Sequence, residues 1–244
     1  MSGYRMKALL SPRNWRKIPH WLRRARHNLL YSLNDEVYWD EYARLWEKEN
    51  KTRRLQYLGN EWAQQESFLS LLEEYARKDA CALELGCGGG RITARGLQLF
   101  QHVYAADVSK EMLRKCRESV RAPNVSFHKL DGFTLAEFAD ASVDFVYSHD
   151  VFVHFPALQV YSYLQEFKRV LKPGGLGLIS FLHFVTQFEW FKQLSLDYFR
   201  QRRVPPHTRH YFVTEEMLRT MLADLSLGIR EIRSEHYLAV VFQK

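Results

Sequence analysis

The sequence predicts an α/β protein with a doubly wound, mostly parallel sheet of seven strands, a C-terminal antiparallel hairpin and an N-terminal helical extension. Beyond Lys78, short apolar runs alternate with helical patterns, which is typical of βαβ units. A glycine-rich turn at 86–90 joins the first apolar run to a helix. The last two apolar runs, 228–233 and 237–244, are separated by three residues, which favours a hairpin. A chain of 244 residues, 46% of them hydrophobic, suits one elaborated domain.

The N-terminal extension differs in charge from the rest of the chain. Residues 1–34 hold eight Lys or Arg and no acid, so the remaining residues have 27 basic against 28 acidic side chains, a net charge of −1. Apolar residues from Ile18 onward recur on one helical face, with arginines away from it, and predict a basic amphipathic helix at 17–33. Two more helices are predicted at 35–50 and 60–78, the second with Asn60 as N-cap.

We therefore divide the chain into an extension, 1–60, and a domain, 61–244. The strands expected before the hairpin lie at 80–85, 102–107, 124–129, 143–149 and 176–182. The helices between and after them lie near 89–100, 109–121, 156–171 and 214–225. The segment at about 183–212 is longer than a minimal connection and rich in aromatic and basic residues, so we expect it to be an insertion that covers the substrate.

The glycine-rich turn predicts a nucleotide site. Backbone N–H groups without side chains at 86–90 can approach a ligand closely. The next residue, Arg91, stands where a dinucleotide fold has glycine, and no Gly-Lys-Ser/Thr follows for a phosphate loop. The pattern is instead Glu84-x-Gly86-x-Gly88-x-Gly90, and a carboxylate before the turn suits an ammonium group better than a pyrophosphate.

This pattern resembles the first motif of the class I S-adenosylmethionine-dependent methyltransferases, E/D-x-G-x-G-x-G. Four further stretches match that family in order: AADVSKEML, HKLDGF, SVDFVYSHDVFVHF and RVLKPGGLGLIS. The resemblance covers roughly residues 62–244. It implies a Rossmann-like fold, S-adenosylmethionine as cofactor and transfer of its methyl group.

The resemblance also assigns the cofactor-binding residues. It implies that Asp107 binds the ribose hydroxyls, that Met112 lines the adenine site and that Asp131 lies near the adenine amino group. An aromatic residue of the preceding helix, Trp39, is expected to cover the cofactor. The full set is Glu84, Gly86, Cys87, Gly88, Gly90, Asp107, Val108, Met112, Asp131, Gly132, Ser148 and Trp39. Simpler interpretations remain open: Asp107 as a helix cap, Asp131 as a turn residue and Trp39 as part of a helix core.

The catalytic candidates follow the fourth predicted strand. Here His149, Asp150 and His154 crowd together, and a helical turn would let Asp150 orient His154 from position i to i+4. We expect His154 to act as a general base, with packing and capping roles for the pair as the alternative. The stretch is similar to the E-x-x-E-H metal motif of ubiquinone-pathway O-methyltransferases, but Val153 replaces the middle acid, so we expect no metal.

The sequence indicates less about the methyl acceptor than about the cofactor. Candidate substrate residues in the insertion are His183, Arg209, His210 and Tyr211, which suit a sugar, an aromatic ring or an anionic group. The sequence has no Asn/Asp-Pro-Pro-aromatic stretch after the fourth strand and no cysteine beyond Cys116. These absences disfavour amino-methylation and cytosine-5 methylation of nucleic-acid bases.

We therefore expect O-methylation of a small-molecule or lipid-linked glycan acceptor. Tryptophans and arginines in residues 15–33 favour contact with an anionic membrane surface, so the enzyme is expected to be cytoplasmic and peripheral at the inner face of the membrane. Three cysteines suit a reducing compartment. Two other functions are open: an RNA methyltransferase that uses the basic arm, although nucleic acid is the less favoured partner, and a non-catalytic protein that kept the cofactor fold.

Overall fold

The computed structural model describes residues 35–53, 66–201, 210–235 and 237–244. The predictions for the basic helix and membrane surface at 15–33, for Asn60 and for Arg209 fall outside these residues. Within them, no helix is long and apolar enough to cross a membrane.

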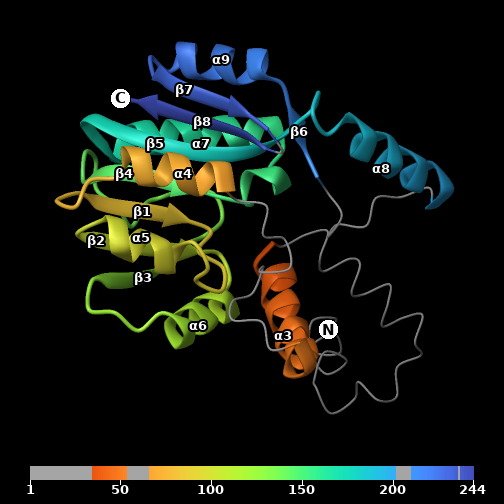
Figure 1. The fold of residues 1–244 in the computed structure, drawn as a ribbon, viewed down its shortest axis with the longest axis horizontal. Coiled ribbons are helices and arrows are strands. Elements are labelled where there is room, and N and C mark those ends of the chain that lie inside the picture. Colours follow the sequence, from red (N-terminus) through yellow and green to blue (C-terminus); the bar gives the residue numbers. More distant parts are fainter. Residues whose placement is uncertain (1–34, 54–65, 202–209, 236) are drawn as a thin grey trace, which may run out of the picture.

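One mixed sheet forms the centre of the molecule (Figure 1). Its strands lie in the order β3-β2-β1-β4-β5-β8-β7, and the short β6 pairs with β5 off this path. All pairs are parallel except those of β8, which is antiparallel to both β5 and β7. The predicted parallel sheet with a C-terminal hairpin is therefore confirmed. The strands are β1 (Cys81–Leu85), β2 (His102–Asp107), β3 (Val125–Lys129), β4 (Val143–Ser148), β5 (Leu171–His183), β6 (Phe212–Val213), β7 (Gly228–Ser234) and β8 (Leu238–Gln243).

Helices cover both faces of the sheet, because the central strands are apolar on both sides. One core joins α7 and α9 to the sheet, and a second joins α4 and α5 to its other face, where α6 also packs. Two further helices, α3 and α8, lie at the edge where the parallel strands end (Figure 1). The bounds are α3 (Asp35–Arg53), α4 (Glu66–Tyr75), α5 (Thr93–Leu99), α6 (Lys110–Ser119), α7 (Ala157–Val170), α8 (Phe188–Gln201) and α9 (Glu215–Asp224).

Two element boundaries differ from the prediction. The helix after the glycine turn begins at Thr93 rather than near 89, because Gly90 has φ +92° and cannot belong to a right-handed helix. Strand β5 begins at Leu171, earlier than 176, and includes a stretch predicted as a turn. That stretch is an irregularity in the β4–β5 pairing, and its Gly174 amide donates to the carbonyl of Lys244 over 2.9 Å.

Helix α8 projects away from the sheet (Figure 1). The side chains of Phe188, Leu196 and Tyr198 are 43%, 51% and 54% exposed. The rings of Phe188 and Phe191 stack on each other and both meet Phe184. This part of the predicted insertion therefore extends from the domain rather than covering the sheet.

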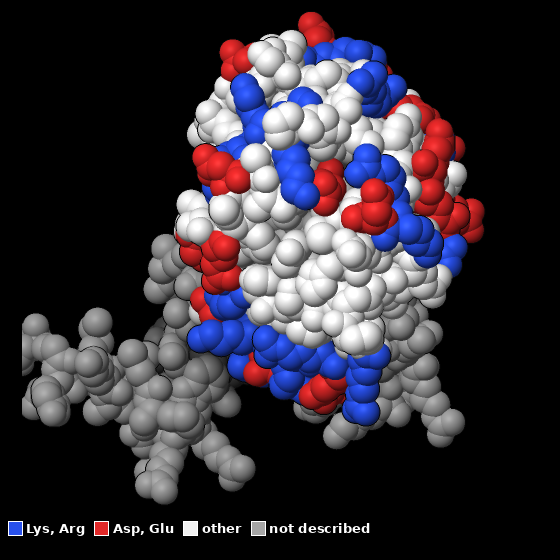
Figure 2. All heavy atoms as spheres, turned by 90° about the vertical axis from the view of Figure 1, so that its left-hand side faces the viewer, with Lys and Arg blue, Asp and Glu red and all other residues white. Residues whose placement is uncertain are grey.

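Figure 2 shows the surface at the amino ends of the parallel strands. Above a large uncharged area, Lys and Arg side chains lie beside Asp and Glu side chains, and a band of mainly Lys and Arg side chains lies below it (Figure 2). One such pair joins Lys172 to Asp144 over 2.8 Å.

Candidate active site

The glycine turn lies at the carboxyl end of β1 and carries three left-handed residues. Gly86, Gly88 and Gly90 have φ of +76°, +51° and +92°, a region that favours glycine. A Cβ at Gly86 would collide with Val151, and one at Gly90 would lie 2.6 Å from Val120 Cγ2. A Cβ at Gly88 would meet nothing within 4 Å. Gly88 thus faces open space, as a cradle for a bound nucleotide requires.

The carboxylate of Asp107 holds this turn against the end of β2. Its Oδ2 accepts a hydrogen bond from the Gly88 amide over 2.9 Å, and its Oδ1 accepts one from the Ser109 amide over 2.8 Å. Burial raises the pKa of Asp107 to about 6, although both amides favour the ionised form. A buried carboxylate with further acceptor capacity beside the open turn fits a ribose, whose hydroxyl groups are donors.

The carboxylate of Glu84 lies beneath the turn, and its side-chain partners are protein hydroxyls. The hydroxyl of Tyr147 donates to Glu84 Oε2 over 3.3 Å, and Thr93 forms a second hydrogen bond. Burial raises the pKa of Glu84 to about 7. Glu84 therefore supports the turn from below, and its predicted contact with the cofactor's ammonium group stays a prediction.

The remaining predicted residues around β2, β3 and β4 divide into two groups. Ser148 donates from Oγ to the carbonyl of Leu85 over 2.8 Å, and Val108 lies against Gly132. The predicted contact of these three residues with the cofactor stays a prediction. Asp131, in contrast, is exposed and accepts hydrogen bonds from the amides of Phe133 and Thr134, both over 2.7 Å. These contacts support the interpretation of Asp131 as a turn residue.

Two predicted cofactor residues come together at α3. Met112 of α6 is buried with Ala43 of α3, and Trp39, Tyr42 and Trp46 pack around them. Cys87 of the turn is buried in a separate cluster with Cys116 of α6. The N-terminal helix therefore packs against α6, and the predicted contact of Trp39 with the cofactor stays a prediction.

The end of β4 differs most from the prediction. Asp150 has φ +60°, a left-handed conformation that is uncommon for aspartate, so no regular helical turn places it opposite His154. Its Oδ2 instead accepts a hydrogen bond from Arg91 Nη2 over 2.8 Å, and the hydroxyl of Tyr237 also bonds to it. Asp150 therefore has partners that the sequence-based hypothesis did not include.

His149 supports Asp150 from within the protein. Because Ser180 Oγ accepts the Asp150 amide over 3.2 Å, it can donate to His149 Nδ1 over 2.9 Å. The proton of the neutral ring then lies on Nε2, which is 3.4 Å from Asp150 Oδ2 and forms no hydrogen bond in the described structure, so His149 acts on Asp150 through Ser180. Burial lowers the pKa of His149 to about 4. A fully enclosed, neutral ring does not reach a substrate, so the predicted catalytic role of His149 is replaced by a supporting one.

His154 lies in a row of rings that crosses the edge of the site. It belongs to a 3-10 helix, η3 (Phe152–His154), and its ring is 5.0 Å from that of Trp39 and 5.4 Å from that of His210. The row continues to Trp190 of α8, 4.7 Å from His210. The side chain of His154 is partly exposed, so its imidazole lies at the surface of the site.

The predicted substrate residues are distributed around this row. His210 belongs to it, and the Tyr211 amide donates to the carbonyl of Val153 over 2.8 Å. His183, at the end of β5, is buried, and its Nδ1 has no hydrogen-bond partner in the described structure. Across the described residues, no three His, Cys, Asp or Glu side chains gather as a metal site would require.

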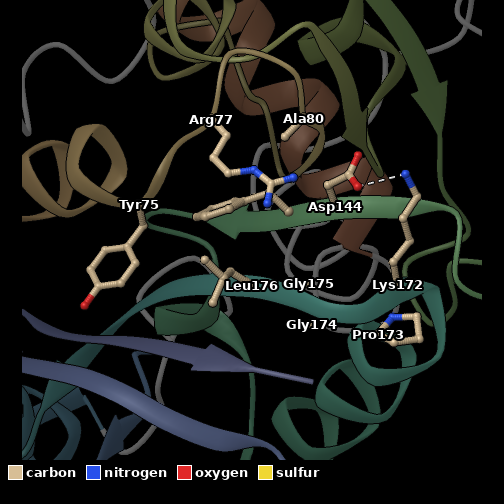
Figure 3. A pocket seen from close by; sticks show the side chains of 10 residues that line it. Tyr75, Arg77, Ala80, Asp144, Lys172, Pro173, Gly174, Gly175 and Leu176 are labelled. Carbon is tan, nitrogen blue, oxygen red and sulfur yellow. Dashed lines mark hydrogen bonds and ion pairs between the residues drawn. The ribbon is translucent and has the colours of Figure 1, made fainter.

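A separate cavity of about 110 Å³ lies at the opposite edge of the sheet (Figure 3). It lies beside the amino ends of β1 and β4, and its lining includes Arg77, Asp144 and Lys172. The Lys172–Asp144 ion pair engages two of these charges. Parallel sheets bind ligands at the carboxyl ends of their strands, so this cavity is not the nucleotide site.

Comparison with known protein families matches residues 83–179 to the family described as "Methyltransferase domain". The match runs from β1 to β5 and so includes the glycine turn, Asp107 and the end of β4. Residues 83–179 therefore form a methyltransferase domain of that family, and the fold around them is the one expected of class I S-adenosylmethionine-dependent methyltransferases. The cofactor is S-adenosylmethionine, and the open turn at Gly88 beside the buried Asp107 carboxylate fits its nucleoside.

Two curated relatives align with part of this methyltransferase. An uncharacterised methyltransferase of Schizosaccharomyces pombe is 32% identical over 126 residues, which cover 47% of this chain and 44% of the relative. The N-terminal Xaa-Pro-Lys N-methyltransferase 1-B of Xenopus laevis is 34% identical over 105 residues, covering 42% and 47%. The aligned part therefore spans less than half of either relative.

Solved structures share the fold. A crystal structure of an S-adenosylmethionine-dependent methyltransferase from Methanosarcina mazei superimposes with a TM-score of 0.60 at 20% identity. The superposition covers 71% of this chain and 96% of that one.

Sequence reasoning did not identify Arg91, Ser180 and Tyr237 as parts of this site. Arg91 was considered only as the residue that breaks a dinucleotide motif, although a basic residue directly after the glycines is a usable signal. Ser180 and Tyr237 come from β5 and the β7–β8 turn, and they meet Asp150 only through the fold.

Proposed function

We propose that this methyltransferase transfers the methyl group of S-adenosylmethionine to an oxygen atom of a small-molecule or lipid-linked acceptor, with His154 as the general base. The observation that carries the proposal is the position of His154. It is partly exposed on η3 at the carboxyl end of β4, between the rings of Trp39 and His210.

The chemistry requires such a group. Methyl transfer from a sulfonium is an in-line displacement, and a hydroxyl acceptor must also lose its proton. When bound, S-adenosylmethionine supplies the electrophilic methyl group. The imidazole of His154 would accept the hydroxyl proton, and the rings of Trp39 and His210 would fix its orientation and exclude water. Asp150 has no part in this orientation, because Arg91 and Tyr237 engage it.

An amine acceptor is the second candidate. It is favoured by the partial similarity to the Xenopus laevis enzyme, whose name gives the N-terminus of Xaa-Pro-Lys chains as its acceptor. An ammonium group must also lose a proton before it attacks, so a base at His154 suits this reaction as well.

Methyl-labelled S-adenosylmethionine distinguishes the candidates. The protein would be incubated with three separate acceptor sets: phenols and lipid-extracted glycans, peptides with a free Xaa-Pro-Lys N-terminus, and RNA. Label in the first set that is attached to oxygen rather than to nitrogen supports O-methylation. Label only in the peptides would replace it with N-methylation, and label only in RNA would replace both.

We also propose that residues 15–33 attach the enzyme to an anionic membrane surface, which would bring it to a lipid-linked acceptor. The support for this proposal comes from the sequence, because residues 1–34 contain eight basic residues and no acid. Sedimentation with phosphatidylglycerol-containing vesicles would compare the full chain with a chain that lacks residues 1–34. Preferential sedimentation of the full chain is expected, and equal partitioning would contradict the proposal.

A further inference from the structure

One carboxylate of the N-terminal extension is bound to the helix that follows Asp107. Asp40 of α3 accepts hydrogen bonds through Oδ1 from Ser109 Oγ over 2.6 Å and from the Glu111 amide over 3.1 Å. These donors lie at the N-terminus of α6, where free amides and the helix dipole favour a negative charge. Asp40 therefore caps α6 from another element of the fold.

Ser109 connects this cap to the cofactor site. It is the N-cap of α6, and its Oγ also accepts from the Met112 amide over 3.0 Å. Its own amide donates to Asp107 Oδ1 over 2.8 Å. Asp40 and Asp107 thus hold the same serine, one through its hydroxyl and the other through its amide.

Ion pairs form another part of the interface between α3 and the domain. Arg44 pairs with Glu111 over 3.2 Å, and Glu36 pairs with Lys129 over 3.3 Å. Glu47 pairs with two residues of α6, Arg114 over 2.9 Å and Lys115 over 3.0 Å. The apolar part consists of buried Ala43 and Met112 with the partly buried rings of Trp39, Tyr42 and Trp46 around them. Docking of α3 (Figure 1) therefore combines ion pairs with apolar contacts.

We propose that Asp40 is a positioning residue for cofactor binding: it fixes Ser109 and, through it, the Asp107 carboxylate, so that docking of α3 and binding of the cofactor strengthen each other. The coupling is reciprocal by thermodynamic necessity. It concerns the cofactor alone and is independent of which acceptor is methylated.

Two properties follow from this arrangement. Because most of the pairs across the interface are partly exposed, salt should screen them, and cofactor affinity should fall as ionic strength rises. Because the coupling acts in both directions, bound cofactor should protect the amides of α3 from hydrogen exchange.

The test uses the full chain and S-adenosylhomocysteine as the ligand. Calorimetric Kd values would be measured at pH 8, where Asp107 is ionised, at about 50 mM and about 500 mM NaCl. The variants are Asp40→Asn, which removes the capping charge, and Arg44→Gln, which removes the ion pair with Glu111 and those with Asp40 and Glu41 in α3 but leaves Ser109 bonded to Asp40. The matched control is Glu41→Gln, because the ion pair of Glu41 is with Arg44 in the same helix, over 3.7 Å. Exchange of peptides covering 35–47 would be followed with and without ligand.

We expect Asp40→Asn to raise the Kd roughly tenfold and Arg44→Gln to raise it by a smaller factor, as loss of a charged hydrogen bond and of an exposed ion pair implies. Glu41→Gln should match the wild type. Ligand should slow exchange in 35–47 of the wild type and less so in Asp40→Asn. Wild-type Kd values for both variants, or exchange in 35–47 that ligand does not alter, would overturn the proposal. A wild-type protein that binds the ligand but methylates no acceptor would contradict only the proposed reaction.

Discussion

The Gly88 amide donates a hydrogen bond to Asp107 Oδ2 over 2.9 Å, so the most open glycine of the nucleotide turn is held by the carboxylate at the end of β2. Burial raises the pKa of that carboxylate to about 6. Ribose hydroxyls donate to the ionised form. Cofactor affinity should therefore be greatest above pH 7 and should fall as the pH drops through about 6. Titration of S-adenosylhomocysteine between pH 5 and 8 checks this, with Asp107→Asn expected to bind weakly and without that pH dependence.

Alanine should have different effects at two glycines of the turn. Gly88→Ala should mainly weaken cofactor binding, and Gly86→Ala should mainly destabilise the fold. At Gly88 the new Cβ meets no protein atom, so Gly88→Ala should cost only about 1 kcal/mol of unfolding free energy for its left-handed backbone. The Cβ would project into the cofactor cradle and raise the Kd at least about tenfold. Gly86→Ala should destabilise the fold by about 2 kcal/mol or more, because the Cβ collides with Val151. Denaturant unfolding and calorimetry together separate the two outcomes, and equal destabilisation would contradict this account of the turn.

Glu84 should make the folded state less stable as the pH rises. Burial raises its pKa from 4.5 to about 7, so the folded state retains a proton that the unfolded state has lost. The stability from this proton is fully present below pH 4.5 and is lost as the pH rises through 7, a change of about 3 kcal/mol. Glu84→Gln keeps the side-chain volume and removes the charge. Its stability advantage over the wild type should therefore grow from pH 5 to pH 8 in urea unfolding of the ligand-free protein. An advantage that stays constant over this range would refute the assignment.

Two histidines five residues apart should respond differently to the same substitution. His154→Gln should lower single-turnover methyl transfer by about a hundredfold or more and leave the Kd for S-adenosylhomocysteine within about twofold. His149→Gln should lower the melting temperature instead, because its ring is enclosed by Phe68 and Tyr237 and bonded to Ser180. Transfer would be measured with the best acceptor found in the labelled screen. Unchanged turnover in His154→Gln would remove it from the mechanism.

Tyr237→Phe tests the network around Asp150. Loss of the hydroxyl leaves Arg91 as the partner of a strained residue with φ +60°. We expect a loss of roughly 1 to 2 kcal/mol in unfolding free energy at pH 7, measured by urea titration. The control is Tyr161→Phe, which removes a hydroxyl from an exposed hydrogen bond to Asp224 and should change stability by less. Equal losses in the two variants would show that the Tyr237 bond has no special role.

The sheet and the glycine turn were predictable because their signals are local. Apolar runs bounded by glycines specify β1 and the following turn within about ten residues. Asp107 could be placed for the same reason, since it ends an apolar run and precedes a helix N-cap at Ser109. Asp131 shows the limit of such reasoning, because a strand-end acid and a turn acid have the same local sequence.

The arrangement around Asp150 and Asp40 could not be predicted, for two physical reasons. The prediction for Asp150 assumed a helical turn after β4, but the backbone there is left-handed and is held by tertiary contacts with Arg91, Ser180 and Tyr237. Asp40 and Ser109 are 69 residues apart, and nothing in either local sequence indicates that they meet. Both contacts depend on how helices and loops pack at the end of the sheet.

The most direct test of the account is isothermal titration of the purified protein with S-adenosylmethionine and S-adenosylhomocysteine, beside Asp107→Ala. We expect the wild type to bind both ligands with micromolar affinity and Asp107→Ala to lose this binding. Absence of binding by a folded wild-type protein, or undiminished binding by a folded Asp107→Ala, would contradict it.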